Sequence, residues 1–289
     1  MEGLIMKHPV ILDACSIINL LRIDDEEDES LLKYIISLDL HIAETVHNEV
    51  KRNYKRNKIA QEKEEYIDRS IVKLQQHLFA TNGFHMDSEI IKDLSRSLYD
   101  ELTTYTNYKK RQNGELLSTA LAVCLSREKS SMVYFYTDDK PATDDFLPYF
   151  HFQQAGTIQD TVDLLIFLHW SNADFKLSDL KRYLSLLWED FNQPLKIMIK
   201  EIAEVKNNLT HAEYKDVCLR KNIDDIIEGF YELDLVKISN AIAKIKENPK
   251  ASRIAKKFDK FPNIEHECHL VSKIRDTRSF IDKYEILKI

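Results

Sequence analysis

The chain has 289 residues, of which 44% are hydrophobic and 31% charged, enough for one large domain or two modest ones. With only five glycines and six prolines it is poor in turn formers, which argues against an all-β fold and for long helices. Its formal net charge of −7 gives no simple nucleic-acid signature, although such a sum can hide local basic patches.

The four cysteines are far apart and none belongs to a CxxC pair, so we expect reduced thiols in a cytosolic protein. We find neither a secretion signal nor a run of eighteen apolar residues. The expected location is therefore cytoplasmic, with no membrane partner.

The first elements of the chain alternate between strand and helix. A short apolar run at residues 10–12 predicts a buried strand that ends at Asp13, with a helix after it. A second short strand is expected at residues 38–42. The helix after it is expected to be capped by Thr45 and to continue to about residue 78.

The same alternation continues to about residue 170. A helix is expected over residues 88–112, and the Asn113-Gly114 pair separates it from a further, apolar helix. The hydrophobic and aromatic stretch at residues 132–137 is typical of a strand buried on both faces. A last strand is expected from residue 150 to 156, with a helix behind it. Alternating strands and helices predict an α/β domain with a mostly parallel sheet, over residues 1–172.

Residues 173–289 contain no strand candidate and predict an all-α C-terminal region. Apolar residues recur at three-or-four spacing over residues 177–209, a pattern typical of a core-facing helix, which Pro194 should kink or split. Further helices are expected at residues 214–219, 223–246, 252–258 and 265–284.

Acidic residues stand in similar settings at four places. Asp13 ends a strand, Glu49 lies in the first turns of the helix after a strand, and Glu115 opens a helix. Asp138 and Asp139 end another strand. In a parallel sheet these positions share one edge, where converging carboxylates repel one another unless a cation lies between them. Mg²⁺ or Mn²⁺ suits such an all-oxygen cluster and supports phosphodiester hydrolysis.

Five stretches in this order resemble the motifs of PIN domains, a superfamily of metal-dependent nucleases. They are VILDACSIINLL, TVHNEVKR, GELLSTALAV, YTDDKPATDDF and AGTIQDTVDLLIFL, and together they cover roughly residues 8–170. The resemblance implies a three-layer α/β domain with a mostly parallel central sheet. It also implies hydrolysis by an activated water, without a covalent enzyme intermediate.

Carried over position by position, the resemblance implies a set of site residues. The implied catalytic carboxylates are Asp13, Glu49, Glu115 and Asp139. The implied metal ligands are Asp13, Glu115 and Asp139, with Asp138 and Asp145 as additional candidates. Thr137 would position its neighbours or a water, and Cys15, with Ser16 next to it, stands where the family commonly has Ser or Asn.

The substrate that the resemblance implies is RNA, and two basic clusters suit a phosphate backbone. The first follows Glu49 directly and supplies the substrate-binding candidates Lys51, Arg52, Lys55 and Arg56, beside Thr137 and Ser16. The second, residues 236–261, holds eight basic and two acidic residues.

The resulting hypothesis is a Mg²⁺- or Mn²⁺-dependent endoribonuclease, with a helical region that could bind an inhibitor or effector protein. One alternative is a DNA nuclease with the same site. Another is a non-catalytic nucleic-acid-binding or scaffold protein. A toxin-like or phage-defence effector is a third interpretation, and the oligomeric state stays open.

Overall fold

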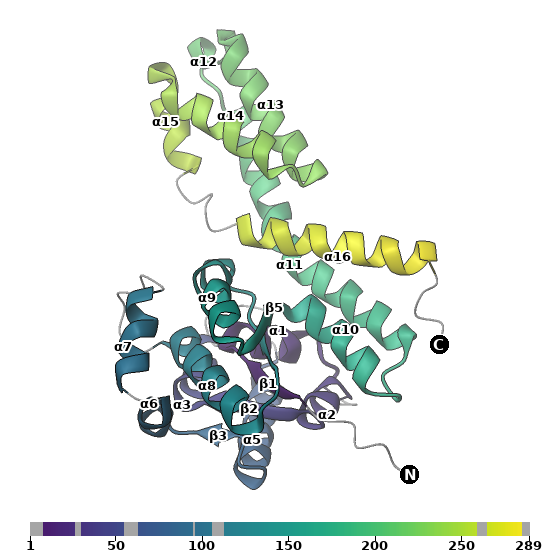
Figure 1. Ribbon diagram of the computed structural model, residues 1–289. Helices are drawn as coiled ribbons and strands as arrows, with labels where there is room; N and C mark the ends of the chain where they lie inside the picture. The colour runs from purple at the N-terminus through teal and green to yellow at the C-terminus, as the bar shows by residue number, and fades with distance from the viewer. Residues whose placement is uncertain are drawn as a thin grey trace. The chain divides into compact units, whose positions relative to one another are not determined.

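The computed structural model describes residues 8–26, 30–54, 63–94, 96–105, 113–258 and 265–284. The chain divides into two units, Met1–Tyr183 and Leu184–Ile289. It is mostly helical, and its sheet lies in the first unit (Figure 1). No helix in the described part of the chain combines the length and apolarity needed to cross a bilayer.

The sheet has five strands, all parallel, in the order β3-β2-β1-β4-β5. The strands are β1 (Pro9–Leu12), β2 (Asp39–Ala43), β3 (Phe84–His85), β4 (Val133–Tyr136) and β5 (Gly156–Gln159). At the centre, Ile11 of β1 is in register with His41 of β2 and with Phe135 of β4. The predicted α/β class with a parallel sheet is therefore confirmed.

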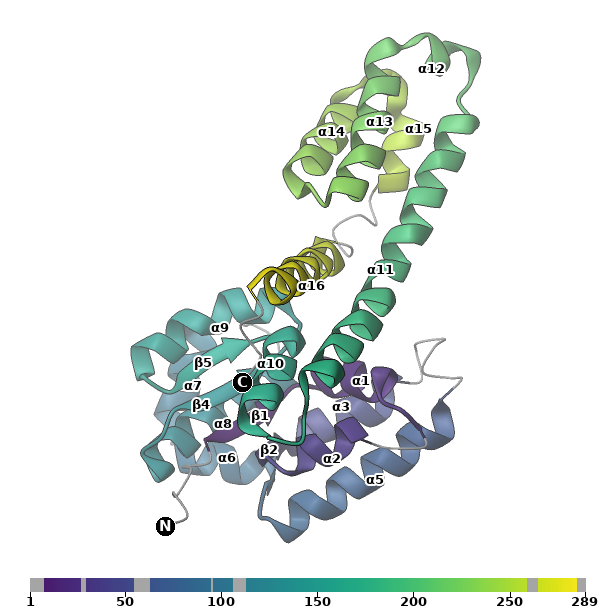
Figure 2. The same cartoon turned by 90° about the vertical axis from the view of Figure 1, so that its right-hand side faces the viewer.

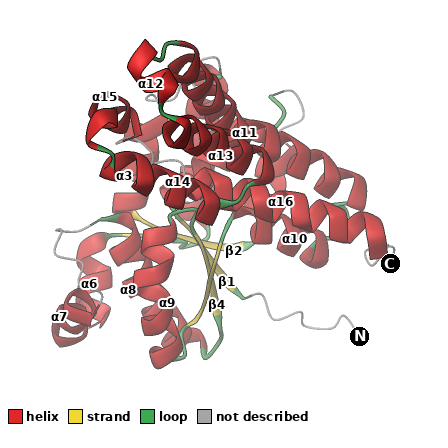
Figure 3. Ribbon diagram, turned by 90° about the horizontal axis from the view of Figure 1, so that it is seen from above, coloured by secondary structure: helices red, strands yellow, loops and turns green. Residues whose placement is uncertain are grey.

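Helices cover both faces of this sheet. They are α1 (Ala14–Ile23), α2 (Ser30–Ile36), α3 (Glu44–Asn53), α5 (Glu64–Ala80), α6 (Asp87–Leu94), α7 (Arg96–Tyr105), α8 (Gly114–Lys129), α9 (Lys140–Gln153) and α10 (Thr161–Ser171). Figure 3 shows α8 and α9 on one side of the strands and α10 on the other. β1 is buried along its whole length, which is why its sequence is apolar without alternation.

Two boundaries in this unit differ from those expected. The helix expected over residues 45–78 is seen as α3 and α5, and residues 55–62 between them lie outside the described residues. Thr45 is not a cap: α3 begins one residue earlier, and the Thr45 amide and hydroxyl donate to Asp87 instead. The last strand was expected to begin at Phe150, but this residue lies in α9. There its buried side chain stacks on Phe135 of β4. The two-residue strand β3 was not predicted from the sequence.

The second unit is all-α in its described residues. The division between the units falls inside α11 (Leu177–Asn207), which runs without interruption through Pro194 (Figure 2). The expected split of the helix at Pro194 is wrong. The helical turns around this proline bury Phe191, Leu195 and Met198, and this packing outweighs the backbone hydrogen bond that proline cannot make.

The helices after α11 are α12 (His211–Lys215), α13 (Val217–Glu232), α14 (Leu235–Glu247), α15 (Ser252–Ala255) and α16 (Glu265–Tyr284). The continuous helix expected over residues 223–246 is broken at Leu233, whose φ of 60° is left-handed, and Asp234 then caps α14. Gly229 permits the close contact of α13 with α14, since a Cβ there would lie 2.6 Å from Ile238 Cγ1.

Candidate active site

Four carboxyl groups from separate parts of the chain converge at the carboxyl edge of the sheet. Asp13 follows β1 and Asp139 follows β4, while Glu49 lies in the second turn of α3 and Glu115 in the first turn of α8. The negative charges of Asp13, Glu49 and Asp139 all act on Glu115. The parallel order of the strands brings these positions together, as their places in the sequence predicted.

The carboxyls of this cluster are hard to ionise together. Burial raises the pKa of Glu115 to about 8, and the neighbouring Asp13 adds to the shift. Burial also raises the pKa of Asp13, and burial together with the nearby Asp13 charge raises that of Glu49. A cation among these groups would favour their ionised forms.

The two oxygens of the Asp13 carboxylate have different surroundings. Its Oδ2 accepts hydrogen bonds from Cys15 Sγ at 3.0 Å and from Thr137 Oγ1 at 3.2 Å. The Thr137 hydroxyl also accepts from the Asp139 amide at 3.1 Å, so it links the two acids. Asp13 Oδ1 is buried and has no hydrogen-bond partner among the residues that the structure describes. A buried carboxylate oxygen without such a partner is well placed to bind a metal ion.

Cys15, two residues after Asp13, contacts the Asp13 carboxylate directly. Its thiol donates to Asp13 and accepts from the Asp138 amide at 3.2 Å. Burial and the nearby Asp13 charge raise its pKa, which keeps the thiol protonated and able to donate. The thiol therefore supplies a hydrogen-bond donor to the aspartate.

Gly114 makes room for the cluster at the start of α8. A Cβ at this residue would lie 2.5 Å from Glu49 Oε2 and 3.2 Å from Asp13 Oδ1. The Gly114 amide donates to Glu49 Oε1 at 3.4 Å, and the preceding Asn113 caps α8 by accepting from the Leu116 amide. The Asn-Gly pair, noted in the sequence only as a break, thus shapes the site.

Three predicted site residues lie elsewhere. Asp138 is buried, and its oxygens accept from Asn19 Nδ2 at 2.7 Å and from the amide and hydroxyl of Thr161. It anchors the start of α10, so we remove it from the ligand set. Asp145 is exposed on α9, and the cluster in the described part of the chain is built without it. Ser16 is fully buried on α1 and so does not reach a substrate.

Of the basic candidates, two are placed by the structure. Lys51 and Arg52 are exposed on α3, and Arg52 Nη2 lies 4.0 Å from Glu49 Oε1. Lys51 Nζ is 3.5 Å from Gln75 Oε1 of α5. Both are within one turn of Glu49. Lys55 and Arg56 lie outside the described residues.

The cluster is not a preformed coordination shell. In the residues that the structure describes, no three His, Cys, Asp or Glu side chains have the arrangement of a metal site. The donor set still fits a hard divalent ion, because it is all oxygen, is difficult to ionise without a cation and includes the orphaned Asp13 Oδ1.

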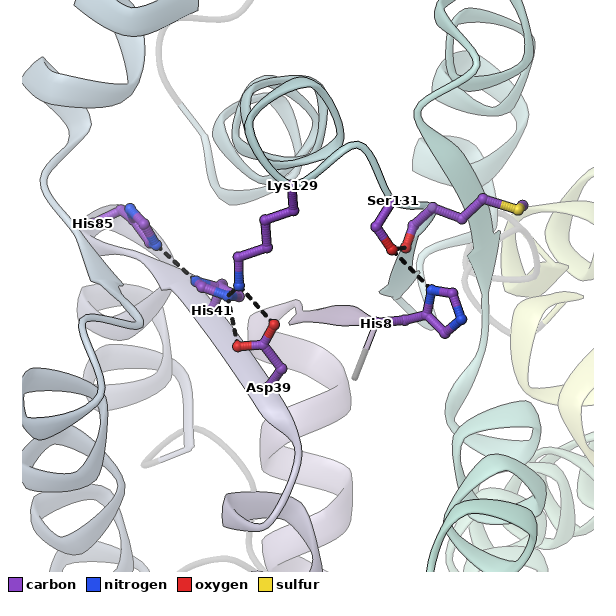
Figure 4. Close-up of polar contacts among 7 residues, drawn as sticks. His8, Asp39, His41, His85, Lys129 and Ser131 are labelled. Carbon is purple, nitrogen blue, oxygen red and sulfur yellow. Dashed lines mark hydrogen bonds and ion pairs between the residues drawn. The ribbon is translucent and has the colours of Figure 1, made fainter. Parts of the chain in front are cut away.

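A second polar cluster, missed in the sequence, lies where β2 starts and α8 ends. Lys129 Nζ lies 2.6 Å from Asp39 Oδ2 and 2.9 Å from His41 Nε2, and His41 Nδ1 lies 2.9 Å from His85 Nε2 (Figure 4). His41 Nε2 also lies 3.1 Å from Asp39 Oδ1, so this ring nitrogen faces both an ammonium and a carboxylate. Burial, reinforced by Lys129, lowers the pKa of His41 to about 4. The contact could not be predicted from the sequence, because positions 41 and 85 are far apart and their spacing matches no motif.

Comparison of the chain with family models finds no match, and comparisons with curated proteins and with solved structures find none at a significant level. The functional assignment therefore depends on the sequence motifs and on the geometry of the cluster.

Proposed function

We propose that the protein is a metal-dependent endoribonuclease whose active site is formed by Asp13, Glu49, Glu115 and Asp139. The observation that carries the proposal is the buried Oδ1 of Asp13, which has no hydrogen-bond partner in the described part of the chain and lies in a cluster of carboxyls that burial and mutual repulsion make hard to ionise. Such a cluster lowers the stability of the folded protein, and a bound cation would offset this cost by neutralising the carboxylates.

Each residue would have a separate task. Asp13, Glu115 and Asp139 would hold Mg²⁺ or Mn²⁺, and Glu49 would complete the acidic wall. Cys15 and Thr137 fix Asp13 through Oδ2, which leaves Oδ1 for the ion. The bound ion would supply charge neutralisation and the activation of a water for phosphodiester hydrolysis. Lys51 and Arg52, exposed beside Glu49, would contact substrate phosphates.

The test is cleavage of end-labelled single-stranded RNA, a circular RNA of the same sequence, and the matching DNA. Each would be incubated with Mn²⁺, Mg²⁺ or EDTA. We expect cleavage of both RNAs with metal only, and a loss of about 100-fold or more in Asp13→Asn. Cleavage of the circle shows internal hydrolysis.

Asp145→Asn is the matched control, because it removes an acid that is exposed on α9. It should keep near-wild-type activity. Full activity in Asp13→Asn would refute the site. Cleavage of DNA alone would keep the site and change the substrate, and no cleavage by the wild type would favour a binding or scaffold protein.

A further inference from the structure

The second unit contains a cavity of about 570 Å³ between the C-terminal half of α11 and the turn that includes α15. This volume is within the range of roughly 300–1,000 Å³ that is typical of small-molecule sites. Its apolar lining comes from Met198, Ile202 and Val205 of α11 and from Phe258. Met198, Ile202 and Phe258 are themselves buried, so they form a packed floor.

The walls of the cavity carry charges of opposite sign. Glu201 and Glu204 stand on the α11 side. Lys256 and Lys257 stand on the other side, in the turn after α15, and all four side chains are exposed. A ligand that fills this cavity therefore needs an anionic end, an end rich in hydrogen-bond donors and an apolar body between them.

Arg253, the third cation of the lining, is paired with a carboxylate of the protein itself. It forms a two-pronged ion pair with Glu213, with Nε–Oε1 at 3.2 Å and Nη2–Oε2 at 2.7 Å. The hydrogen bonds from Arg253 hold the pKa of Glu213 at about 2. Glu213 in turn closes a capping box with Thr210 at the start of α12. This ion pair fixes α15 to α12, and Lys256 and Lys257 are the lining cations that would face a ligand.

We propose that this cavity binds a nucleotide. Lys256 and Lys257 would contact its phosphates, and Glu201 and Glu204 would accept hydrogen bonds from the N–H groups of its base. Guanine fits best, because its Watson–Crick edge presents adjacent donors to a carboxylate. The apolar floor would cover the ring. The site uses no residue of the carboxylate cluster and does not depend on the nuclease proposal.

The nucleotide could be free in solution or part of an RNA strand, and one experiment separates these sources. The full chain would be titrated in EDTA, which prevents metal-dependent cleavage, against the fluorescent analogue MANT-GTP and against a fluorescein-labelled RNA 10-mer. Inorganic tripolyphosphate would be the competitor without a base. Anisotropy reports binding of each labelled probe.

Lys256→Ala with Lys257→Ala should weaken MANT-GTP binding about tenfold or more. The matched control is Lys244→Ala with Lys246→Ala, which removes the same charge from α14 outside the cavity and should change binding less than about twofold. Glu201→Gln with Glu204→Gln should weaken MANT-GTP but not tripolyphosphate.

No saturable binding of MANT-GTP at millimolar concentration would overturn the proposal, as would equal losses in the two lysine pairs. Tripolyphosphate that binds as tightly as GTP would refute recognition of the base. If the RNA 10-mer is displaced by GTP and weakened by the Lys256 and Lys257 changes, the nucleotide belongs to a strand. RNA binding that ignores these changes would identify the free nucleotide as the ligand.

Discussion

Asp138 and Asp139 are neighbours in the chain but have different surroundings. Asp138 is buried, with three hydrogen bonds that connect the end of β4 to α1 and α10. Asp139 is half-buried, caps α9 by accepting from the Ala142 amide, and contributes charge to the cluster. At this scale one carboxylate stabilises the fold and its neighbour belongs to the proposed chemistry.

Replacing each by asparagine should separate the two roles. Asp138→Asn should lower the free energy of unfolding by about 2 kcal/mol, because an amide nitrogen would face buried donors in place of an acceptor. Asp139→Asn should cost little stability, since asparagine also caps helices, but should abolish RNA cleavage. Urea unfolding followed by circular dichroism, beside the cleavage assay, measures both; the reverse pattern would exchange the assignments.

Glu115 is the clearest case of a side chain placed at a cost to stability. Burial and three neighbouring acids oppose its ionisation. In EDTA at neutral pH, Glu115→Gln should therefore raise the free energy of unfolding by about 1 kcal/mol while cleavage activity falls. Glu101→Gln, on the exposed surface of α7, is the control. A destabilised Glu115→Gln protein would show that the carboxylate makes a favourable contact instead.

At the scale of elements, the start of β2 is tied to the end of α8 and to β3 through the cluster of Asp39, His41, His85 and Lys129. The imidazole of His41 is buried and its Nε2 contacts both Lys129 and Asp39, and burial together with the Lys129 charge favours its neutral form. Protonation would place two cations in contact. The junction of these three elements should therefore be sensitive to acid.

The direction of this effect follows from the pKa of His41, about 4 in the folded protein and ordinarily 6.5. Between these values the unfolded chain binds the proton and the folded chain does not, so stability is lost as pH falls from 6.5 towards 4. His41→Gln should reduce the loss between pH 7 and pH 5 by about 1–2 kcal/mol. Urea unfolding at both pH values measures it, with the exposed His151→Gln as control. An unchanged pH dependence would contradict the arrangement.

Elements with a strong local pattern were predictable, and those set by distant contacts were not. The strands β1 and β4 are apolar without interruption, so burial on both faces could be inferred. The convergence of the four acids followed from their places at strand ends and helix starts. The burial of Asp138 depends on Asn19 and Thr161, far away in the chain, and the continuity of α11 through Pro194 depends on packing.

At the scale of the whole molecule, the proposed ion should stabilise the chain that binds it. A ligand at 100 times its Kd adds about 2.7 kcal/mol to the free energy of unfolding, equivalent to a rise of roughly 5–10 °C in the unfolding midpoint of the unit concerned. We expect Mn²⁺ or Mg²⁺ to produce such a rise in the wild type, and EDTA to reverse it. Asp13→Asn should show little of it and Asp145→Asn all of it. Differential scanning fluorimetry measures this, and equal shifts in all three proteins would indicate binding elsewhere.

The order of the strands has a consequence for biosynthesis. β1 emerges first from the ribosome, but one of its two partners is β4, and the Asp13 amide bonds to the Tyr136 carbonyl at 3.0 Å. Asp13 and Asp139 can therefore meet only after translation has passed β4, and sheet pairing between such distant segments is slow. A nascent chain, or one that terminates early, carries no complete carboxylate cluster. If the protein cleaves RNA, the message and ribosome that produce it are spared until most of the first unit has been made.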